Sequence, residues 1–217
     1  MTADALASWS DRCEAFLAGR RGGDSAHDLA HVRRVVAWAR RLGEAEGADL
    51  AVVLPAAWLH DVVVLPKDHP DRALASRRAA DVASAWLTEA GYPAPLVPEV
   101  AHAVEAHSFS AGVAPRTREA AVVQDADRLD ALGAIGVARL YATAGALGSA
   151  LVHPDDPVPG AAATRPLDDH RYATDHFAAK LLRLAATMRT EAGRAEAERR
   201  TAFLQTFLAE LARETRP

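Results

Sequence analysis

The sequence is short of several kinds of residue, and each shortage excludes a class of protein. It has one cysteine, Cys13, so no disulfide can form within the chain, and we expect a protein of the reducing cytoplasm. No uncharged apolar run approaches ~20 residues, which excludes a membrane-spanning helix. The first residues lack a basic flank and an apolar run, so no signal peptide is expected. Lysine is scarce as well, because only Lys67 and Lys180 occur among 25 basic residues.

Charge and length narrow the remaining classes. The formal net charge of -4 argues against general binding of nucleic acid. A chain of 217 residues, half of them hydrophobic, is long enough for one domain that buries about 70% of its unfolded surface. We therefore expect one globular domain with neither a nucleic-acid nor a membrane partner.

Apolar residues recur at helical spacing along most of the chain. The β-branched run at 62–65 is the only strand signal, and it is short. The pattern predicts an all-α fold of one domain over 1–217, with a core at about 24–150, a loop rich in proline and aspartate at 151–169, and C-terminal helices at 170–214 packed onto the core. The expected helices span 2–19, 26–47, 50–61, 72–90, 98–107, 117–131, 134–146, 170–190 and 194–214.

Polar residues stand where the chain is most apolar. The all-round apolar stretch LAVVLPAAWL belongs in the core, and His60 and Asp61 follow it directly. An ionised aspartate is costly to bury without a partner. His31 lies on the preceding helix, and Asp127 follows another apolar helical face. Two imidazoles and two carboxylates form a mixed nitrogen and oxygen set, which suits a divalent ion with open positions better than a structural zinc.

The order of these residues resembles that of a known family. His31, His60-Asp61 and Asp127 are similar to the H…HD…D signature of the HD-domain metal-dependent phosphohydrolases. The segments HDLAHVRRV, LHDVV, VVQDADRLDALGAIGVAR and HFAAKLL resemble its small stand-alone bacterial branch, over about residues 24–190. The resemblance implies an HD-domain helical bundle that binds one divalent metal ion, with Mn favoured and Fe, Co, Ni, Zn or Mg as alternatives. It also implies four metal ligands, namely His31, His60, Asp61 and Asp127.

The same resemblance implies the chemistry, which is hydrolysis by a metal-activated water. His60 and Asp61 are the expected catalytic residues, and Asp61 can both bind metal and accept a proton from the water. Charge that builds on phosphoryl oxygens calls for nearby cations. Basic residues close to the His60-Asp61 pair in the sequence are therefore candidate phosphate contacts.

The segment that follows this pair offers such cations. Lys67 and Arg72 are candidate phosphate contacts, because Arg72 opens a helix whose N-terminus also favours an anion. Ser76 lies one turn further on the same face. The alternative is a solvated loop before an ordinary capped helix. His27 shares a helix face with His31, and it either lines the pocket or merely begins the helix.

Two further residues are expected near the metal. His107 lies on the helix before Asp127, and we expect it to line the pocket beside a single metal ion. Asp130 lies about one turn from Asp127 on the same side of its helix. We interpret Asp130 as a support for the site or as a contact between helices.

The roles of three other residues stay open. Arg128 either acts at the site or pairs with Asp125 or Glu119. His176 and Lys180 are four residues apart in HFAAKLL. This pair either caps the active site or packs the last helices, and packing is slightly favoured.

The choice of substrate rests on the resemblance. The His60-Asp61 pair is followed by VVVL and not by the Glu-Asp pair expected of alarmone hydrolases, and no Gly-Tyr-Pro motif follows a histidine pair as in cyclic-dinucleotide enzymes. The chain is also too short for the usual dNTP triphosphohydrolase. We expect a pyrophosphohydrolase that converts nucleoside or deoxynucleoside triphosphates to monophosphate and diphosphate. The alternatives are a phosphomonoesterase or phosphodiesterase of a nucleotide or other small phosphate, and a non-catalytic metal and nucleotide sensor. A homodimer is also an open alternative.

Overall fold

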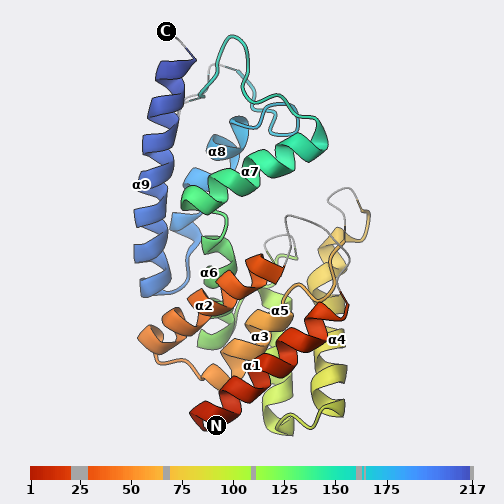
Figure 1. Ribbon diagram of the computed structural model, residues 1–217. Helices are drawn as coiled ribbons and strands as arrows, with labels where there is room; N and C mark the ends of the chain where they lie inside the picture. The colour runs from red at the N-terminus through yellow and green to blue at the C-terminus, as the bar shows by residue number, and fades with distance from the viewer. Residues whose placement is uncertain (21–28, 66–68, 109–110, 160–162, 164, 216–217) are drawn as a thin grey trace. The chain divides into compact units, whose positions relative to one another are not determined.

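The computed structural model describes residues 1–20, 29–65, 69–108, 111–159, 163 and 165–215. Within these ranges the chain forms α-helices and short 3-10 turns without a β-strand, and an isolated bridge joins Ala150 to Tyr172 (Figure 1). The expected all-α fold is therefore confirmed. Two of the predicted substrate contacts, His27 and Lys67, lie outside the described residues.

The chain divides into two compact units. Unit 1 comprises Met1–Asp127 and Arg189–Gly193, and unit 2 comprises Arg128–Met188 and Arg194–Pro217. The boundary falls directly after Asp127, inside a helix. The organisation as a single domain stays a prediction.

Unit 1 is a bundle built around one central helix. The helix α3 contacts α1, α2, α4 and α5, and its residues from Ala51 to Leu59 are all buried. This central place is the one expected of an all-round apolar helix. In Figure 1 the helices of this unit lie side by side. They are α1 (Ala3–Ala18), α2 (Leu29–Glu46), α3 (Leu50–Leu59), α4 (Ala75–Glu89), α5 (Val97–Ala106) and the start of α6 (Arg118–Leu129), with 3-10 turns at Arg72–Leu74 and Ala94–Leu96.

A proline lies inside α3 without ending it. Pro55 lacks the N–H that would bind the carbonyl four residues earlier, which is that of Ala51. The hydroxyl of Tyr92 donates a hydrogen bond to this carbonyl instead. Burial raises the pKa of the Tyr92 phenol, which keeps the hydroxyl protonated as a donor. The Ala51 carbonyl of the central helix thus has a hydrogen-bond donor despite the proline.

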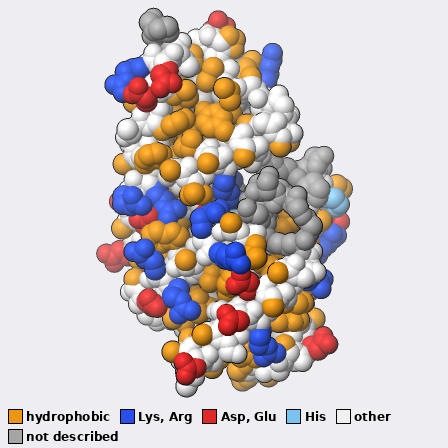
Figure 2. Space-filling view, in the orientation of Figure 1, with side chains coloured by type: hydrophobic (Ala, Val, Ile, Leu, Met, Phe, Trp, Pro, Cys, Tyr) orange, Lys and Arg blue, Asp and Glu red, His pale blue; other side chains and the backbone are white. Residues whose placement is uncertain are grey.

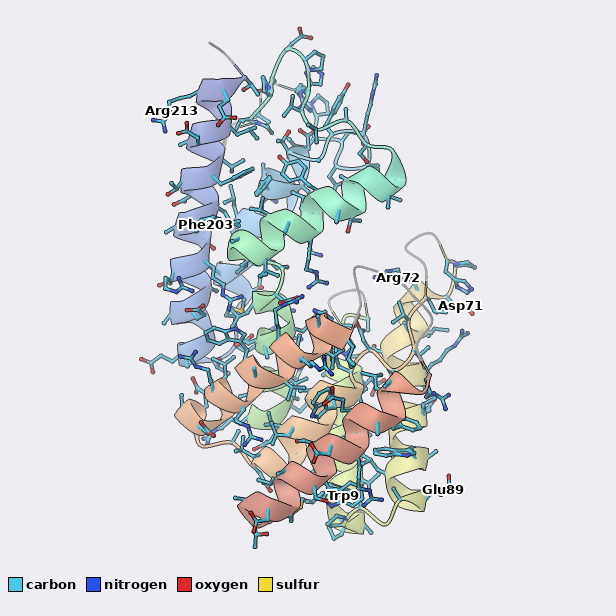
Figure 3. The ribbon with its side chains drawn as sticks, in the orientation of Figure 1. Trp9, Asp71, Arg72, Glu89, Phe203 and Arg213 are labelled. Carbon is cyan, nitrogen blue, oxygen red and sulfur yellow. The ribbon has the colours of Figure 1, made fainter. Side chains whose placement is uncertain are left out.

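Aromatic side chains hold α1 against α4. Phe16 stacks on Trp86 with ring centroids 4.3 Å apart, and Trp9 meets Tyr92 edge-on at 4.7 Å. Figure 3 labels Trp9 on α1. Such offset and edge-on pairs stabilise a contact beyond the area that they bury. Aromatic packing therefore helps to fix the outer helix α1 to the bundle, together with the ion pair of Glu14 with Arg33 and the hydrogen bond from Arg12 to the carbonyl of Ala90.

Unit 2 is less regular than the sequence predicts. It holds the end of α6, α7 (Gly133–Leu147), the short α8 (Asp175–Ala179) and most of α9 (Glu191–Glu214). The predicted helix over 170–190 is wrong, because α8 is followed by 3-10 turns at Leu181–Arg183 and Ala185–Thr187.

Local backbone and side-chain features explain this break. The backbone of Lys180 leaves the helical region, with φ -137° and ψ -59°. The hydroxyl of Thr187 donates to the carbonyl of Leu184 at 2.7 Å. Such a bond offers the backbone an alternative to the helix.

A buried ion pair organises the irregular segment of unit 2. The side chain of Asp175 is fully buried and accepts two hydrogen bonds of 2.7 Å from the guanidinium of Arg165. The backbone N–H of Asp168 donates to the same carboxylate at 2.7 Å. Burial would raise the pKa of Asp175, but these hydrogen bonds outweigh it and hold the pKa below its ordinary value. The carboxylate therefore stays ionised inside the unit.

A buried carboxylate in unit 1 binds the segment Arg189–Gly193, which returns to this unit from the C-terminal part of the chain. Asp125 of α6 is fully buried and accepts hydrogen bonds from the N–H of Arg189 at 3.0 Å. The N–H and the hydroxyl of Thr190 donate to it at 2.8 Å each. An added Cβ on Gly193 would lie 2.6 Å from Asp125 Oδ2, so this close approach requires a glycine. We call Arg189–Gly193 the anchor segment.

The surface of the described part is mixed. In Figure 2 exposed apolar side chains lie between charged ones on the face in view. Phe203 of α9, labelled in Figure 3, is 45% exposed. Among the described helices, none combines the length and the hydropathy that crossing a membrane requires.

Candidate metal centre

Four polar side chains of unit 1 face one another. His31 lies in the first turn of α2, His60 and Asp61 directly follow α3, and Asp127 lies in the last turn of α6. Nε2 of His31 is 3.5 Å from Asp127 Oδ1 and 3.9 Å from Asp61 Oδ2. Nε2 of His60 is 3.6 Å from Asp61 Oδ2 and 3.8 Å from Asp127 Oδ1. Both imidazoles thus face the same two carboxylate oxygens.

The spacing and burial of these atoms fit a metal ion. The nitrogen-to-oxygen distances exceed those of good hydrogen bonds. One ligand atom each from His31, His60 and Asp127 lies within 4.8 Å of the others. Nε2 of His60 is buried and has no hydrogen-bond partner in the part of the chain that the structure describes. A divalent cation would satisfy this nitrogen, and the mixed donor set suits one.

The end of α3 fixes which nitrogen of His60 points into the cluster. Nδ1 lies 2.8 Å from the carbonyl of Ala57, so it carries the proton and donates it there. Nε2 then keeps its lone pair, which is the arrangement found in metal-binding histidines. Burial lowers the pKa of His60 to about 4 against the opposing charge of Asp61, so the imidazole is neutral.

His107 repeats this design at the end of α5. Its Nδ1 donates to the carbonyl of Val104 at 2.6 Å, and its Nε2 lies 3.5 Å from Asp61 Oδ1. Its ring centroid is 4.9 Å from that of His60. Burial lowers the pKa of His107, but the negative charge of the nearby Asp61 outweighs it, so the pKa is raised. The structure thus places His107 on the other oxygen of Asp61.

Two further polar residues, Gln124 and His102, bind backbone groups and not the cluster itself. The side-chain amide of Gln124 donates to the carbonyl of Ala106 at 2.7 Å, directly before His107. Gln124 was not among the predicted site residues, although a polar residue inside the apolar run VVQDA was a signal. His102 of α5 has another use, since its Nε2 accepts the N–H of Arg116 at 2.9 Å.

The structure also shows the contacts of Asp130 and Arg128, two residues that follow Asp127 in the sequence and whose roles were open. In unit 2, Asp130 is buried and forms an ion pair with Arg139 of α7. This agrees with a contact between helices. Arg128 donates to the carbonyl and hydroxyl of Thr187 at 2.8 and 3.1 Å.

The pair from HFAAKLL lies in unit 2. His176 forms an ion pair of 2.7 Å with Asp169. Lys180 follows α8, and its N–H donates to the carbonyl of His176 at 3.0 Å. These contacts lie within unit 2, and the role of the pair stays a prediction.

The predicted phosphate contacts at the start of α4 are described in part. Arg72 opens the 3-10 turn before α4, and its guanidinium donates to the carbonyl of Leu65. Asp71 beside it pairs with Arg78, and Figure 3 labels both Asp71 and Arg72 in this turn. The hydroxyl of Ser76 is buried without a hydrogen-bond partner among the described residues. Arg72 is therefore bound to the backbone of Leu65, while the hydroxyl of Ser76 has no described hydrogen-bond partner.

Known proteins are similar to this chain in sequence and in fold. The profile of the HD domain family matches residues 28–132. The protein YpgQ of Bacillus subtilis is 35% identical over 191 residues, which cover 86% of this chain and 83% of that protein. The crystal structure of YpgQ in complex with ADP has a TM-score of 0.75 and 31% identity, with 96% of each chain covered.

Two further solved structures that are similar to this chain are of HD-superfamily hydrolases. An HD-superfamily hydrolase from Bacillus thuringiensis has a TM-score of 0.74 and 31% identity, covering 96% of this chain and 97% of its own. A structure from an uncultured Thermotogales bacterium, described as a predicted HD-superfamily hydrolase, has a TM-score of 0.63 and 25% identity, covering 94% and 91%.

Proposed function

Since the chain belongs to the HD-domain superfamily of hydrolases, we propose that it is a metal-dependent phosphohydrolase that cleaves nucleoside or deoxynucleoside triphosphates to monophosphate and diphosphate. The observation that carries this proposal is the cluster of His31, His60, Asp61 and Asp127, with a buried His60 nitrogen that lacks a hydrogen-bond partner among the described residues. The ADP bound to YpgQ supports a nucleotide as the substrate. The single cysteine supports action in the cytoplasm, and a homodimer stays a prediction.

The four side chains of the cluster would hold the ion, and we propose Mn²⁺ as its identity. Two nitrogens and two oxygens suit Mn²⁺ and leave room for water and substrate. A divalent ion in such a site supplies Lewis acidity, which lowers the pKa of water and offsets negative charge on phosphate.

The chain's own residues would orient and deprotonate the attacking water. Asp61 directs Oδ2 toward His31 and His60 and Oδ1 toward His107, so one carboxylate reaches both the metal ligands and a further imidazole. We assign Asp61 as the proton acceptor. His107 keeps Asp61 oriented, because its own ring is fixed by the carbonyl of Val104.

The start of α4 would bind the phosphates away from the attacked atom. The buried hydroxyl of Ser76 is a donor without a described acceptor, and it lies in the first turn of a 15-residue helix. Arg72 adds a positive charge before this turn, with donors beyond the one directed at Leu65. Lys67 and His27 complete the proposed substrate contacts.

Phosphorus NMR tests the reaction directly. Metal-stripped protein reloaded with Mn²⁺ is incubated with nucleoside triphosphates, deoxynucleoside triphosphates and nucleoside monophosphates. We expect diphosphate and monophosphate from the triphosphates, and loss of this turnover in His31→Asn. The control is His102→Asn, a buried histidine that binds Arg116 instead of the cluster, and it should keep the activity.

The other outcomes select the other functions. Orthophosphate released from monophosphates alone would replace this proposal by a phosphomonoesterase. Nucleotide binding without turnover, unchanged in His31→Asn, would favour a sensor.

A further inference from the structure

Two carboxylates of α6 lie on opposite sides of the helix. Asp125 and Asp127 are two positions apart, which is about 200° around a helix of 3.6 residues per turn. Asp127 accordingly faces His31 and His60, while Asp125 binds Arg189 and Thr190 of the anchor segment. The anchor segment therefore binds α6 on the side opposite to Asp127, only two residues away from this proposed metal ligand.

The anchor segment also reaches the helix that carries His31. The N–H of Ala192 donates to Glu46 Oε1 at 2.8 Å, and Glu46 is the last residue of α2. The same five residues thus bind α6 through Asp125 and α2 through Glu46. Asp127 and His31, which lie 3.5 Å apart, are carried by these two helices.

The contacts of Asp125 are dense and specific. The carboxylate is fully buried, and it accepts from two backbone N–H groups and one hydroxyl at 2.8 to 3.0 Å. Thr190 Oγ1 in turn accepts the N–H of Gly193 at 3.0 Å. A buried carboxylate bound in this way resists rotation of its helix, because any rotation breaks several hydrogen bonds at once.

We propose that Asp125 is a positioning residue of the metal centre. By binding the anchor segment, it fixes α6 about its own axis and thereby holds the Asp127 carboxylate at the distance from His31 and His60 that metal binding needs. This inference rests on the proposed function, because it takes the cluster to be the metal site. Asp125 itself contacts neither metal nor substrate in this scheme.

The dissociation constant of Mn²⁺, measured by isothermal titration calorimetry on folded metal-free protein, tests the proposal. In Asp125→Asn we expect it to rise about tenfold, at the low end of the effect of groups that orient metal ligands. In Thr190→Val, which loses the hydroxyl but keeps the shape, we expect a rise of about threefold, as for one hydrogen bond. Thr190→Ser keeps the hydroxyl and should restore the wild-type value.

Activity at different Mn²⁺ concentrations gives a second readout. If only the position of Asp127 is disturbed, saturating Mn²⁺ should return kcat of Thr190→Val to near the wild-type value. The matched control is Asp130→Asn, which removes another buried carboxylate, three residues after Asp127 in the sequence, that pairs with Arg139. Asp130→Asn should leave the Mn²⁺ dissociation constant within about twofold, since its ion pair with Arg139 lies in unit 2 and not at the anchor segment.

Each contrary result has a clear meaning. Wild-type Mn²⁺ affinity in both Asp125→Asn and Thr190→Val, or an equal loss in Asp130→Asn, would overturn the positioning role. If Asp125→Asn does not fold, Thr190→Val and its rescue by Thr190→Ser decide. Asp127→Asn separates the two proposals, because Mn²⁺ affinity unchanged in that variant would refute the metal site and hence the proposed function.

Discussion

Units 1 and 2 each contain a cluster of carboxylates and basic side chains, and the two clusters are built in opposite ways. In unit 2, Asp175 is met at 2.7 Å by two guanidinium nitrogens of Arg165 and by the N–H of Asp168. In the cluster of unit 1, the nitrogens of His31, His60 and His107 come no closer to Asp61 and Asp127 than 3.5 Å.

The difference separates a structural cluster from one made to receive a ligand. Buried polar groups are nearly always hydrogen-bonded, so a charge that serves stability has its partners within the protein. Asp175 follows this rule. Nε2 of His60 has no such partner in the described part of the chain, although Nδ1 of the same ring has one. What distinguishes this nitrogen is that it faces carboxylate oxygens of both Asp61 and Asp127, which together form a set of metal ligands.

Replacing His60 should give the largest effect. We expect His60→Asn to lower turnover on the order of 10³-fold, because metal binding supplies several kcal/mol to such reactions. The free energy of unfolding of the metal-free protein should change little, since the asparagine amide can replace Nδ1 as the donor to the carbonyl of Ala57 and Nε2 makes no described hydrogen bond. Steady-state kinetics and urea unfolding measure the two effects. A large loss of stability with intact turnover would show that the cluster of unit 1 is structural, like that of unit 2.

Replacing Arg165 should give the opposite result. Arg165→Met leaves the buried charge of Asp175 without its partner, which typically costs about 3–5 kcal/mol of unfolding free energy. Urea unfolding measures this loss, and the double variant Arg165→Met, Asp175→Leu should recover part of it. Mn²⁺ affinity should stay at the wild-type value. A Mn²⁺ affinity that falls along with stability would contradict the division of roles.

Acid should act on the cluster of unit 2 through Asp175. Its pKa lies below the ordinary 3.8, so the unfolded chain takes up the proton first as the pH falls. The stability that the ionised carboxylate contributes is present above about pH 4 and is lost as the pH falls through the folded pKa. Urea midpoints at pH 6, 4 and 3 should show this decline. The decline should be shallower in Arg165→Met, and an equal slope in both proteins would count against Asp175 as its source.

An exposed ion pair should have the smallest effect. The side chains of Arg78 and Asp71 are 45% and 43% exposed, so solvent screens their attraction. We expect Arg78→Ala to change the unfolding free energy by less than about 0.5 kcal/mol. Thermal unfolding of Arg78→Ala and Arg165→Met, measured side by side, compares the two losses of stability. Similar losses would show that burial does not decide how much an ion pair contributes to stability.

The sequence predicted those parts of the site that rest on local pattern. The apolar run of α3 predicted a central helix, and the polar pair at its end, His60 and Asp61, stood out against that background. His107 was expected in the pocket, and the structure places it beside Asp61. A helical period shows which residues are inside, but it does not show which oxygen of a carboxylate a histidine will face.

The sequence did not predict features that depend on partners far along the chain. Tyr92 binds the Ala51 carbonyl across 41 residues, and Asp125 binds Arg189 across 64. No local pattern marks such a pair. The predicted helix over 170–190 failed for a local reason, because the hydroxyl of Thr187 and the backbone of Lys180 compete with apolar periodicity.

The bond between Asp125 and the anchor segment also sets an order of events during synthesis. A chain grows from its N-terminus, so all four proposed ligands have been made once Asp127 is added. The groups that hold Asp125 follow only 64 and 65 residues later. A product that stops before Arg189 would therefore carry a full set of ligands on a helix that nothing from the anchor segment holds, and the site reaches its final form only after Arg189 and Thr190 have been added.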